Sequence, residues 1–332
     1  MVLALLGILK HGQPNDTFNT KRLFRDAFVE FVATTLFIFS GTLSASSTGK
    51  KLALGQGAAE DVGRVLPIAM AFGISIMTLA YSIGHLTGGH MNPAVSLLMF
   101  FRRQMSATKM IFYWIAQFVG AILGASLTWG CVSSLAGDPV LNGEFKRPPF
   151  HLGANTLDPT MTAGNGFLLE FMGSVVFFFV IAQTALDKRG IADSMFPAIP
   201  IGFSLVVVHI CLIPFTGCGV NPARTFGPSI VVCMAGGDCE AVMGDAYWIY
   251  WIGPFLASWA VAELTLIMEM DVDGVEAATA PKEIESAGED APNTDLAKEE
   301  QELMKEVANT AEEPEISPDE EQPGVQASTL SA

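Results

Sequence analysis

The fold is decided by one stretch, Gly217-Cys218-Gly219-Val220-Asn221-Pro222-Ala223-Arg224-Thr225-Phe226-Gly227-Pro228. Asparagine is a good helix N-cap and proline is favoured at the first helical position, so Asn221-Pro222 predicts a helix start. The apolar run that follows ends at Gly236-Gly237. The predicted helix has roughly three turns, which is too short to cross a bilayer that needs about 20 residues.

A second copy of this device lies earlier in the chain. Gly88-Gly89-His90-Met91-Asn92-Pro93-Ala94 again joins a glycine-rich loop to Asn-Pro-Ala, and a short apolar helix is predicted from there to Phe101. One such motif alone is most simply an ordinary helix cap. Paired short segments in the two halves of a membrane protein instead indicate a site built from broken helices.

The composition is typical of a membrane protein. Hydrophobic residues make up 50% of the chain, and the mean hydropathy is +0.41. The apolar runs are long and nearly free of charge, which predicts an all-α polytopic membrane protein. Six spans are predicted, at about Ala27–Ser46, Val65–Gly84, Met110–Cys131, Gly166–Ala185, Phe196–Ile213 and Trp248–Met268.

The two halves of the chain repeat one another. Glu30 is followed seven residues later by Phe37, and Glu170 is followed at the same spacing by Phe177. Each half holds three spans and one short helix, so the second half has the opposite orientation in the membrane. This is an inverted repeat, with its first unit at about 25–131 and its second at about 164–268.

Basic residues predict the side of the membrane on which the termini lie. Six full spans place both termini on one side. That side carries nine Lys and Arg residues, from Lys10 to Arg189, against five on the other side. The positive-inside rule therefore predicts that the N- and C-termini are cytosolic.

The net charge of −16 is confined to the C-terminal tail. From Glu269 onward the chain has 19 acidic and 3 basic residues, and the rest is neutral overall. We interpret 269–332 as a mostly disordered cytosolic tail, with a short helix predicted over 294–307 and Ser317 as a hypothetical phosphorylation site. A cytosolic partner of this tail is an open alternative to a purely solvated role. Nothing in the charge pattern indicates nucleic-acid binding.

The five cysteines do not predict a disulfide framework, because their number is odd. Cys233 and Cys239 are close enough in the chain to pair, but the sequence favours free thiols at both positions. No metal site and no cofactor are predicted.

The two Asn-Pro-Ala motifs, with their glycine-rich loops and the spans around them, closely resemble the aquaporin (major intrinsic protein) family, in particular its water-selective branch. The resemblance covers about residues 25–266. It implies six transmembrane helices plus two re-entrant half-helices, and a homotetramer with one pore per subunit. Residues 1–24 are then a cytosolic N-terminal segment, 25–268 the channel domain and 269–332 the tail. Water is the implied permeant, with no catalysis.

The resemblance also assigns a selectivity filter. A lone arginine in apolar surroundings is costly and usually functional, and Arg224 stands where the first repeat has Val95. Phe72 and His209 are placed by their spacing from the motifs, although each taken alone could belong to the core. Glycerol-conducting relatives have an aspartate where this chain has Thr225. The implied filter is Phe72, His209, Cys218 and Arg224.

The remaining candidate residues surround the motifs. The half-helix N-termini are expected to present the Asn92 and Asn221 amides to the lumen, in the motifs Asn92-Pro93-Ala94 and Asn221-Pro222-Ala223. Glu30 and Glu170 are expected to support the re-entrant loops, with a proton relay as the alternative. The expected pore lining is Gly88, Gly89, His90, Met91, Gly217, Gly219, Val220, Phe37, Ile76, Phe177 and Leu205.

The sequence predicts a passive water channel that excludes protons and ions. Within the channel class, the alternative is conduction of hydrogen peroxide or other small neutral solutes. A coupled secondary transporter is a different class, because inverted repeats and intramembrane acids also occur there. A junction or scaffold protein that acts through its acidic tail is the third.

Overall fold

The computed structural model describes residues 19–52, 61–133, 149–186 and 197–269. Six helices in these ranges are long and apolar enough to cross a membrane, and no strand occurs among the described residues. The predicted all-α polytopic fold is therefore confirmed. The long helices are α2 (Thr20–Leu52), α3 (Asp61–Thr87), α5 (Ala107–Val132), α6 (Ala163–Ile181), α7 (Ala198–Thr216) and α10 (Ile249–Glu269).

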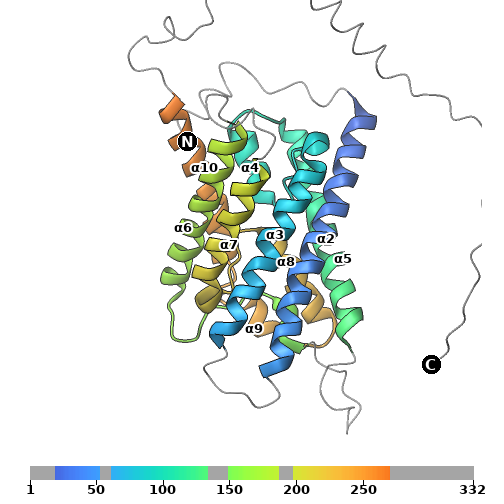
Figure 1. Cartoon of the computed structure of the whole chain (residues 1–332), viewed down its shortest axis with the longest axis vertical. Helices are drawn as coiled ribbons and strands as arrows, with labels where there is room; N and C mark the ends of the chain where they lie inside the picture. The colour runs from blue at the N-terminus through green and yellow to red at the C-terminus, as the bar shows by residue number, and fades with distance from the viewer. Residues whose placement is uncertain (1–18, 53–60, 134–148, 187–196, 270–332) are drawn as a thin grey trace, which may run out of the picture. The chain divides into compact units, whose positions relative to one another are not determined.

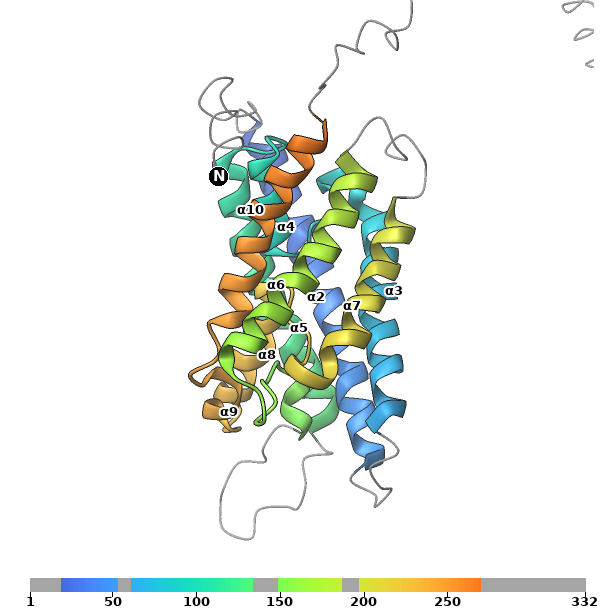
Figure 2. The ribbon, with the colours of Figure 1, turned by 90° about the vertical axis from the view of Figure 1, so that its left-hand side faces the viewer.

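Two short helices complete the bundle, and both begin at the predicted motifs. The half-helix α4 (Pro93–Phe101) is capped by Asn92, and α8 (Pro222–Met234) is capped by Asn221. Each asparagine Oδ1 accepts a hydrogen bond from a backbone N–H in the first turn, and proline occupies the next position. The two half-helices lie toward opposite ends of the bundle, α4 at the top and α8 at the bottom of Figures 1 and 2.

The packing repeats with the sequence. In the first half α2 packs on α5 and α3, and in the second α6 packs on α10 and α7. Each half-helix packs on the last long helix of the other half, α4 on α10 and α8 on α5. The halves are therefore interleaved, as an inverted repeat requires.

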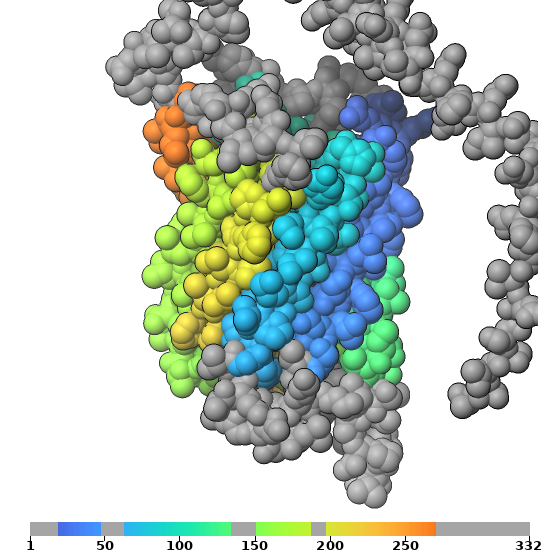
Figure 3. Space-filling view, in the orientation of Figure 1, coloured from blue at the N-terminus to red at the C-terminus, as the bar shows by residue number. Residues whose placement is uncertain are grey.

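The outer surface of the bundle is apolar. Figure 3 shows α6, α7, α3 and α2 as adjacent bands across one face. Large hydrophobic side chains of these helices, such as Phe203, Val207 and Leu36, are exposed, whereas Glu30 and Glu170 are fully buried inside the bundle. Exposed apolar faces around polar interior groups are expected of a protein solvated by lipid.

Several boundaries differ from the expected ones. Helix α2 starts at Thr20, inside the segment predicted to precede the membrane domain, because the Asn19 side chain and carbonyl accept from Arg22 and Leu23. The segment between α5 and α6 contains a short 3₁₀ helix, η3 (Pro149–Gly153). Helix α6 ends in a π-helical turn, η4 (Ala182–Leu186). The predicted tail helix and Ser317 lie outside the described residues.

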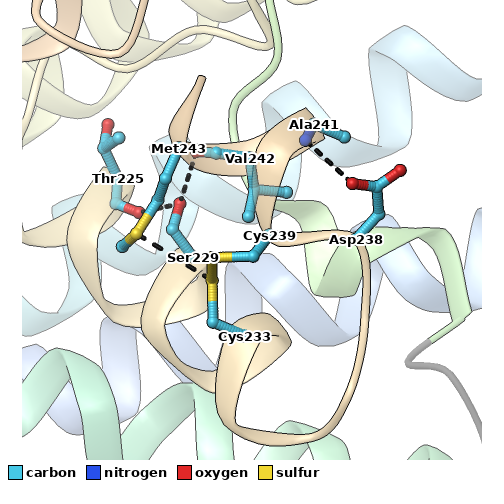
Figure 4. Close-up of a disulfide and its surroundings, with 8 residues drawn as sticks. All are labelled: Thr225, Ser229, Cys233, Asp238, Cys239, Ala241, Val242 and Met243. Atoms are coloured by element: carbon cyan, nitrogen blue, oxygen red, sulfur yellow. Dashed lines mark hydrogen bonds between the residues drawn. A yellow bond between two sulfur atoms is a disulfide. The ribbon is translucent and has the colours of Figure 1, made fainter. Parts of the chain in front are cut away.

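The expectation of free thiols at Cys233 and Cys239 is wrong. The two residues form a disulfide that joins the end of α8 to the start of α9 (Cys239–Met243), as Figure 4 shows. Asp238 caps α9 by accepting from the N–H of Ala241, and this turn brings the two cysteines within 4.8 Å of each other at Cα. The pairing depends on this local turn, which cysteine spacing alone does not reveal.

Close contact between α3 and α7 positions the centre of the bundle. A Cβ atom at Gly73 would lie 2.2 Å from Val206 Cγ2 and 2.7 Å from the carbonyl oxygen of Gly202. Small residues at such crossings let two membrane helices approach to backbone contact. The neighbouring residue Phe72 thereby faces α7.

We expect Gly73→Ala to destabilise the folded protein by about 1–3 kcal/mol, the usual range for overpacking a close contact. Gly84→Ala on the same helix is the matched control, because a Cβ atom there meets nothing within 4 Å. Thermal unfolding of both purified variants in detergent measures the difference. Equal melting temperatures would mean that the α3–α7 contact can relax.

Candidate functional site

The two re-entrant loops share one unusual backbone path. Positive φ angles occur at Gly88, Gly89 and Met91 in the first loop, and at the matching Gly217, Cys218 and Val220 in the second. A β-branched residue such as Val220, with φ of 46°, is a genuine outlier. Such strain persists only where the surroundings over-determine the conformation.

Glu170 supplies that constraint in the second loop. Its two carboxylate oxygens accept hydrogen bonds from the N–H groups of Gly219 and Val220, at 2.9 and 2.8 Å. The hydroxyl of Thr216 donates to the same carboxylate. Three donors converge on a fully buried carboxylate, and this satisfies backbone groups that no water in a bilayer can reach.

Glu30 does the same in the first loop. It accepts from the N–H groups of His90 and Met91, at 2.9 and 2.8 Å, and from the hydroxyl of Thr87. Gln117 on α5 adds a fourth donor. Both buried acids are thus engaged with loop donors.

Sequence reasoning missed the second layer of this network. The Tyr113 hydroxyl donates to the carbonyl of Thr87, and the Tyr250 hydroxyl donates to the carbonyl of Thr216, at 3.0 and 2.9 Å. The Gln117 amide also reaches Ser96 in α4. The sequence does place a tyrosine at matching positions of the two repeats, Tyr113 and Tyr250. Without the fold, this match is only weak evidence of a shared role.

Each of the two asparagines donates a hydrogen bond to the re-entrant loop of the other repeat. Asn92 Nδ2 donates to the carbonyl of Val220 at 3.0 Å, and Asn221 Nδ2 donates to the carbonyl of Met91 at 2.9 Å. Each amide nitrogen carries two hydrogens, so each retains one donor beyond the crossed bond. Both asparagines line the central cavity.

Three of the four predicted filter side chains touch. The rings of Phe72 and His209 stack with centroids 4.7 Å apart, and Cζ of Arg224 lies 4.5 Å from the Phe72 centroid. Phe72 and Cys218 are 0% exposed, His209 1% and Arg224 2%. The space among these side chains is therefore at most water-sized.

Arg224 is anchored by an outer loop that sequence reasoning left unassigned. Its Nη1 donates to the carbonyl of Gly153 at 2.7 Å. Two residues further on, Asn155 accepts from the hydroxyl of Thr225 and donates to the carbonyl of Thr216. The segment after η3 thereby ties α8 to the end of α7. A Gly and an Asn in a loop give no specific signal for this role.

A narrow cavity with room for about one water molecule lies between the two motifs. Nine of the predicted pore and filter residues line it together with both asparagines. Phe72, Cys218, Gly88, Gly89, Met91 and Gly217 do not line it, and neither do the Pro-Ala residues of the motifs. The lining is Phe37, Ile76, His90, Asn92, Phe177, Leu205, His209, Gly219, Val220, Asn221 and Arg224.

Two polar atoms at this cavity have no hydrogen-bond partner among the described residues, His209 Nε2 and Arg224 Nε. His209 Nδ1 lies 3.0 Å from the carbonyl of Leu205 and must donate to it. In the neutral ring Nε2 is then an acceptor, while Arg224 Nε is a donor. These two atoms therefore offer one acceptor and one donor at the cavity. In the described ranges, no three His, Cys, Asp or Glu side chains gather to hold a metal ion.

This geometry defines a class of protein, an α-helical membrane protein in which two half-helices from opposite faces meet at a central cavity. Residues 17–264 match the family described as major intrinsic protein, and the chain belongs to this family. Its members are channels and not enzymes, so the chain is a multi-pass membrane channel for water or small solutes.

Individual relatives agree with this assignment. Aquaporin-1 of Sus scrofa is 36% identical over 242 residues, which cover 72% of this chain and 80% of that protein. Probable aquaporin PIP-type 7a of Pisum sativum is 35% identical over 238 residues, covering 71% and 75%. The crystal structure of the aquaglyceroporin from Plasmodium falciparum shares the fold, with a TM-score of 0.61 at 18% identity over 73% of this chain and 95% of that one.

We expect Glu170→Gln to lower both the thermal stability of the protein and its solute conduction. A glutamine presents an NH₂ group toward at least one loop N–H, and a buried donor without an acceptor costs about 1–3 kcal/mol. Glu240→Gln on the exposed face of α9 is the control. Thermal unfolding in detergent and vesicle flux report the two effects. A Gln variant as stable as the unmodified protein would rule out a supporting role for this carboxylate.

Proposed function

We propose that the chain is a passive water channel that conducts water along an osmotic gradient and excludes protons and ions. The observation that carries this proposal is the pair of crossed asparagines at a cavity next to the Phe72–His209–Arg224 contact. A water molecule is small enough for this contact and offers both a donor and an acceptor.

The asparagines orient the permeating water. The free amide hydrogens of Asn92 and Asn221 both donate to the oxygen of one water, because both side chains line the cavity. That water then points its own hydrogens outward along the pore and cannot pass a proton between its neighbours. The positive ends of the α4 and α8 dipoles meet at the same point and oppose cations, as in the general account of aquaporin-type selectivity.

The filter discriminates by size and by polarity. Phe72 and His209 limit the width, while His209 Nε2 and Arg224 Nε replace the hydrogen bonds that a water loses on entering. Thr225 bonds to Asn155 instead of providing the aspartate of glycerol-conducting relatives. Cys218 completes the filter in this proposal.

The cavity beyond the filter has an apolar wall. Phe37, Ile76, Phe177 and Leu205 come from four different helices and line it together. Water passes such a wall without being held, which fast conduction requires. We also propose that four copies assemble as a homotetramer with one pore per subunit, which is typical of the family.

Stopped-flow light scattering of proteoliposomes tests the function, with sorbitol and then glycerol as the osmolyte. We expect fast water efflux and no glycerol entry. His209→Ala removes one wall of the filter, so its glycerol permeability should rise by about tenfold or more while water still passes.

The outcomes separate the candidate functions. Glycerol entry into liposomes of the unmodified protein at a rate near that of water would contradict a water-selective filter. Flux that saturates and depends on an ion gradient would indicate a coupled transporter. Water efflux no faster than in empty liposomes would contradict a constitutively open water channel.

We propose that both termini are cytosolic. The distribution of basic residues supports this orientation, and the Cys233–Cys239 disulfide supports it independently. Disulfides persist on the oxidising side of a membrane. The end of α8 lies on the side opposite the termini in this topology, so both arguments agree.

Labelling of cells that carry the chain at their surface tests the orientation. Cys131 and Cys211 are exposed free thiols, so a background with both Cys131→Ser and Cys211→Ser is used. After treatment with a membrane-impermeant reductant, polyethylene glycol maleimide should shift the protein by two labels on intact cells. No shift should occur without reductant. Labelling that requires permeabilised cells would reverse the orientation.

A further inference from the structure

Gly41 on α2 has no side chain, and the ring of Phe72 occupies the space where one would lie. A Cβ atom at position 41 would lie 2.1 Å from Cε1, 2.3 Å from Cζ and 2.5 Å from Cδ1 of Phe72. These three atoms form one continuous edge of the ring. Ordinary contact begins at 3.4 Å, so the ring would have to move by more than 1 Å to admit a single methyl group.

The other sides of the ring are held by residues of the pore. His209 stacks on it at 4.7 Å, Arg224 approaches its centroid to 4.5 Å, and Phe37 meets it edge-on at 5.6 Å. All three of these neighbours line the central cavity. A ring displaced away from α2 therefore moves toward the groups that line the pore.

The backbone of α3 cannot withdraw instead. Gly73, the next residue after Phe72, is already in backbone contact with Gly202 and the side chain of Val206 on α7. A shift of α3 away from α2 would compress that crossing. A side chain at position 41 would therefore displace the Phe72 ring and disturb its contacts with His209 and Arg224.

We propose that Gly41 is a positioning residue that sets the width of the filter. Because Gly41 has no side chain, the ring of Phe72 packs against the backbone of α2 and stays away from the pore. This assignment rests on the proposed water-channel function. Gly41 itself does not line the cavity. Its effect on the permeating molecule is transmitted through one aromatic ring.

Four variants in proteoliposomes test the assignment, with water and glycerol flux normalised to the amount of folded protein from size exclusion. We expect Gly41→Ala to lose at least tenfold of its water permeability while eluting like the unmodified protein. Phe72→Val should conduct water and admit glycerol. The double variant Gly41→Ala/Phe72→Val should recover water flux, because the clashing ring is gone. Gly84→Ala should match the unmodified protein.

Each outcome bears on the proposal. Unchanged water and glycerol fluxes in Gly41→Ala would overturn it, although the water-channel function would stand. If Gly41→Ala fails to fold, the double variant decides: recovery of fold and flux supports the clash with Phe72, and continued misfolding overturns it. An unmodified chain that conducts no water would overturn the proposed function and this assignment together.

Discussion

The structure depends on satisfying the backbone N–H groups of two loops that enter the membrane. Non-helical backbone at that depth has no access to bulk water, and each unpaired group is costly there. Glu30 and Glu170 meet this requirement with two N–H groups each. Because these hydrogen bonds fix the loops, they also fix the asparagines at the ends of the loops. The two half-helices begin at these asparagines, so their starting positions are fixed as well. The apolar spans form the frame around this polar centre, and the acids are the reason that it can be buried.

Much of this architecture could be predicted from the sequence. Helix spans, half-helix starts and the repeat all follow from local patterns, namely apolar length, Asn-Pro caps and the recurrence of Glu30 and Phe37 as Glu170 and Phe177. The contacts that complete the site could not be predicted, because they join segments far apart in the chain. Gly153 meets Arg224 across 71 positions, and Asn155 meets Thr225 across 70. The prediction for Cys233 and Cys239 was wrong for a local reason, because their pairing depends on the turn before α9 and not on the number of residues between them. Some helix ends also differ from the predicted ends. Helix α2 begins at Thr20, before its apolar stretch, because Asn19 caps it there.

The proposed filter is built from side chains of several elements. Phe72 comes from α3, His209 from α7 and Arg224 from α8, and each is fixed by a different device. A close helix crossing sets the first, a backbone carbonyl orients the second, and an outer loop anchors the third. No single helix determines the width. Loop 149–155 and the packing of α2 therefore bear on the positions of these side chains without lining the cavity themselves.

The crossed asparagine bonds have a consequence for the order in which the chain is completed during synthesis. Asn92 finds its acceptor on Val220, which the ribosome adds 128 residues later. When the first three spans have entered the bilayer, the amide of Asn92 still lacks this partner, and the carbonyl of Met91 lacks its own donor on Asn221. The first half is thus an unfinished unit until the second half-helix folds back beside it. A chain that stops before Asn221 therefore lacks half of the hydrogen bonds that close the centre of the bundle.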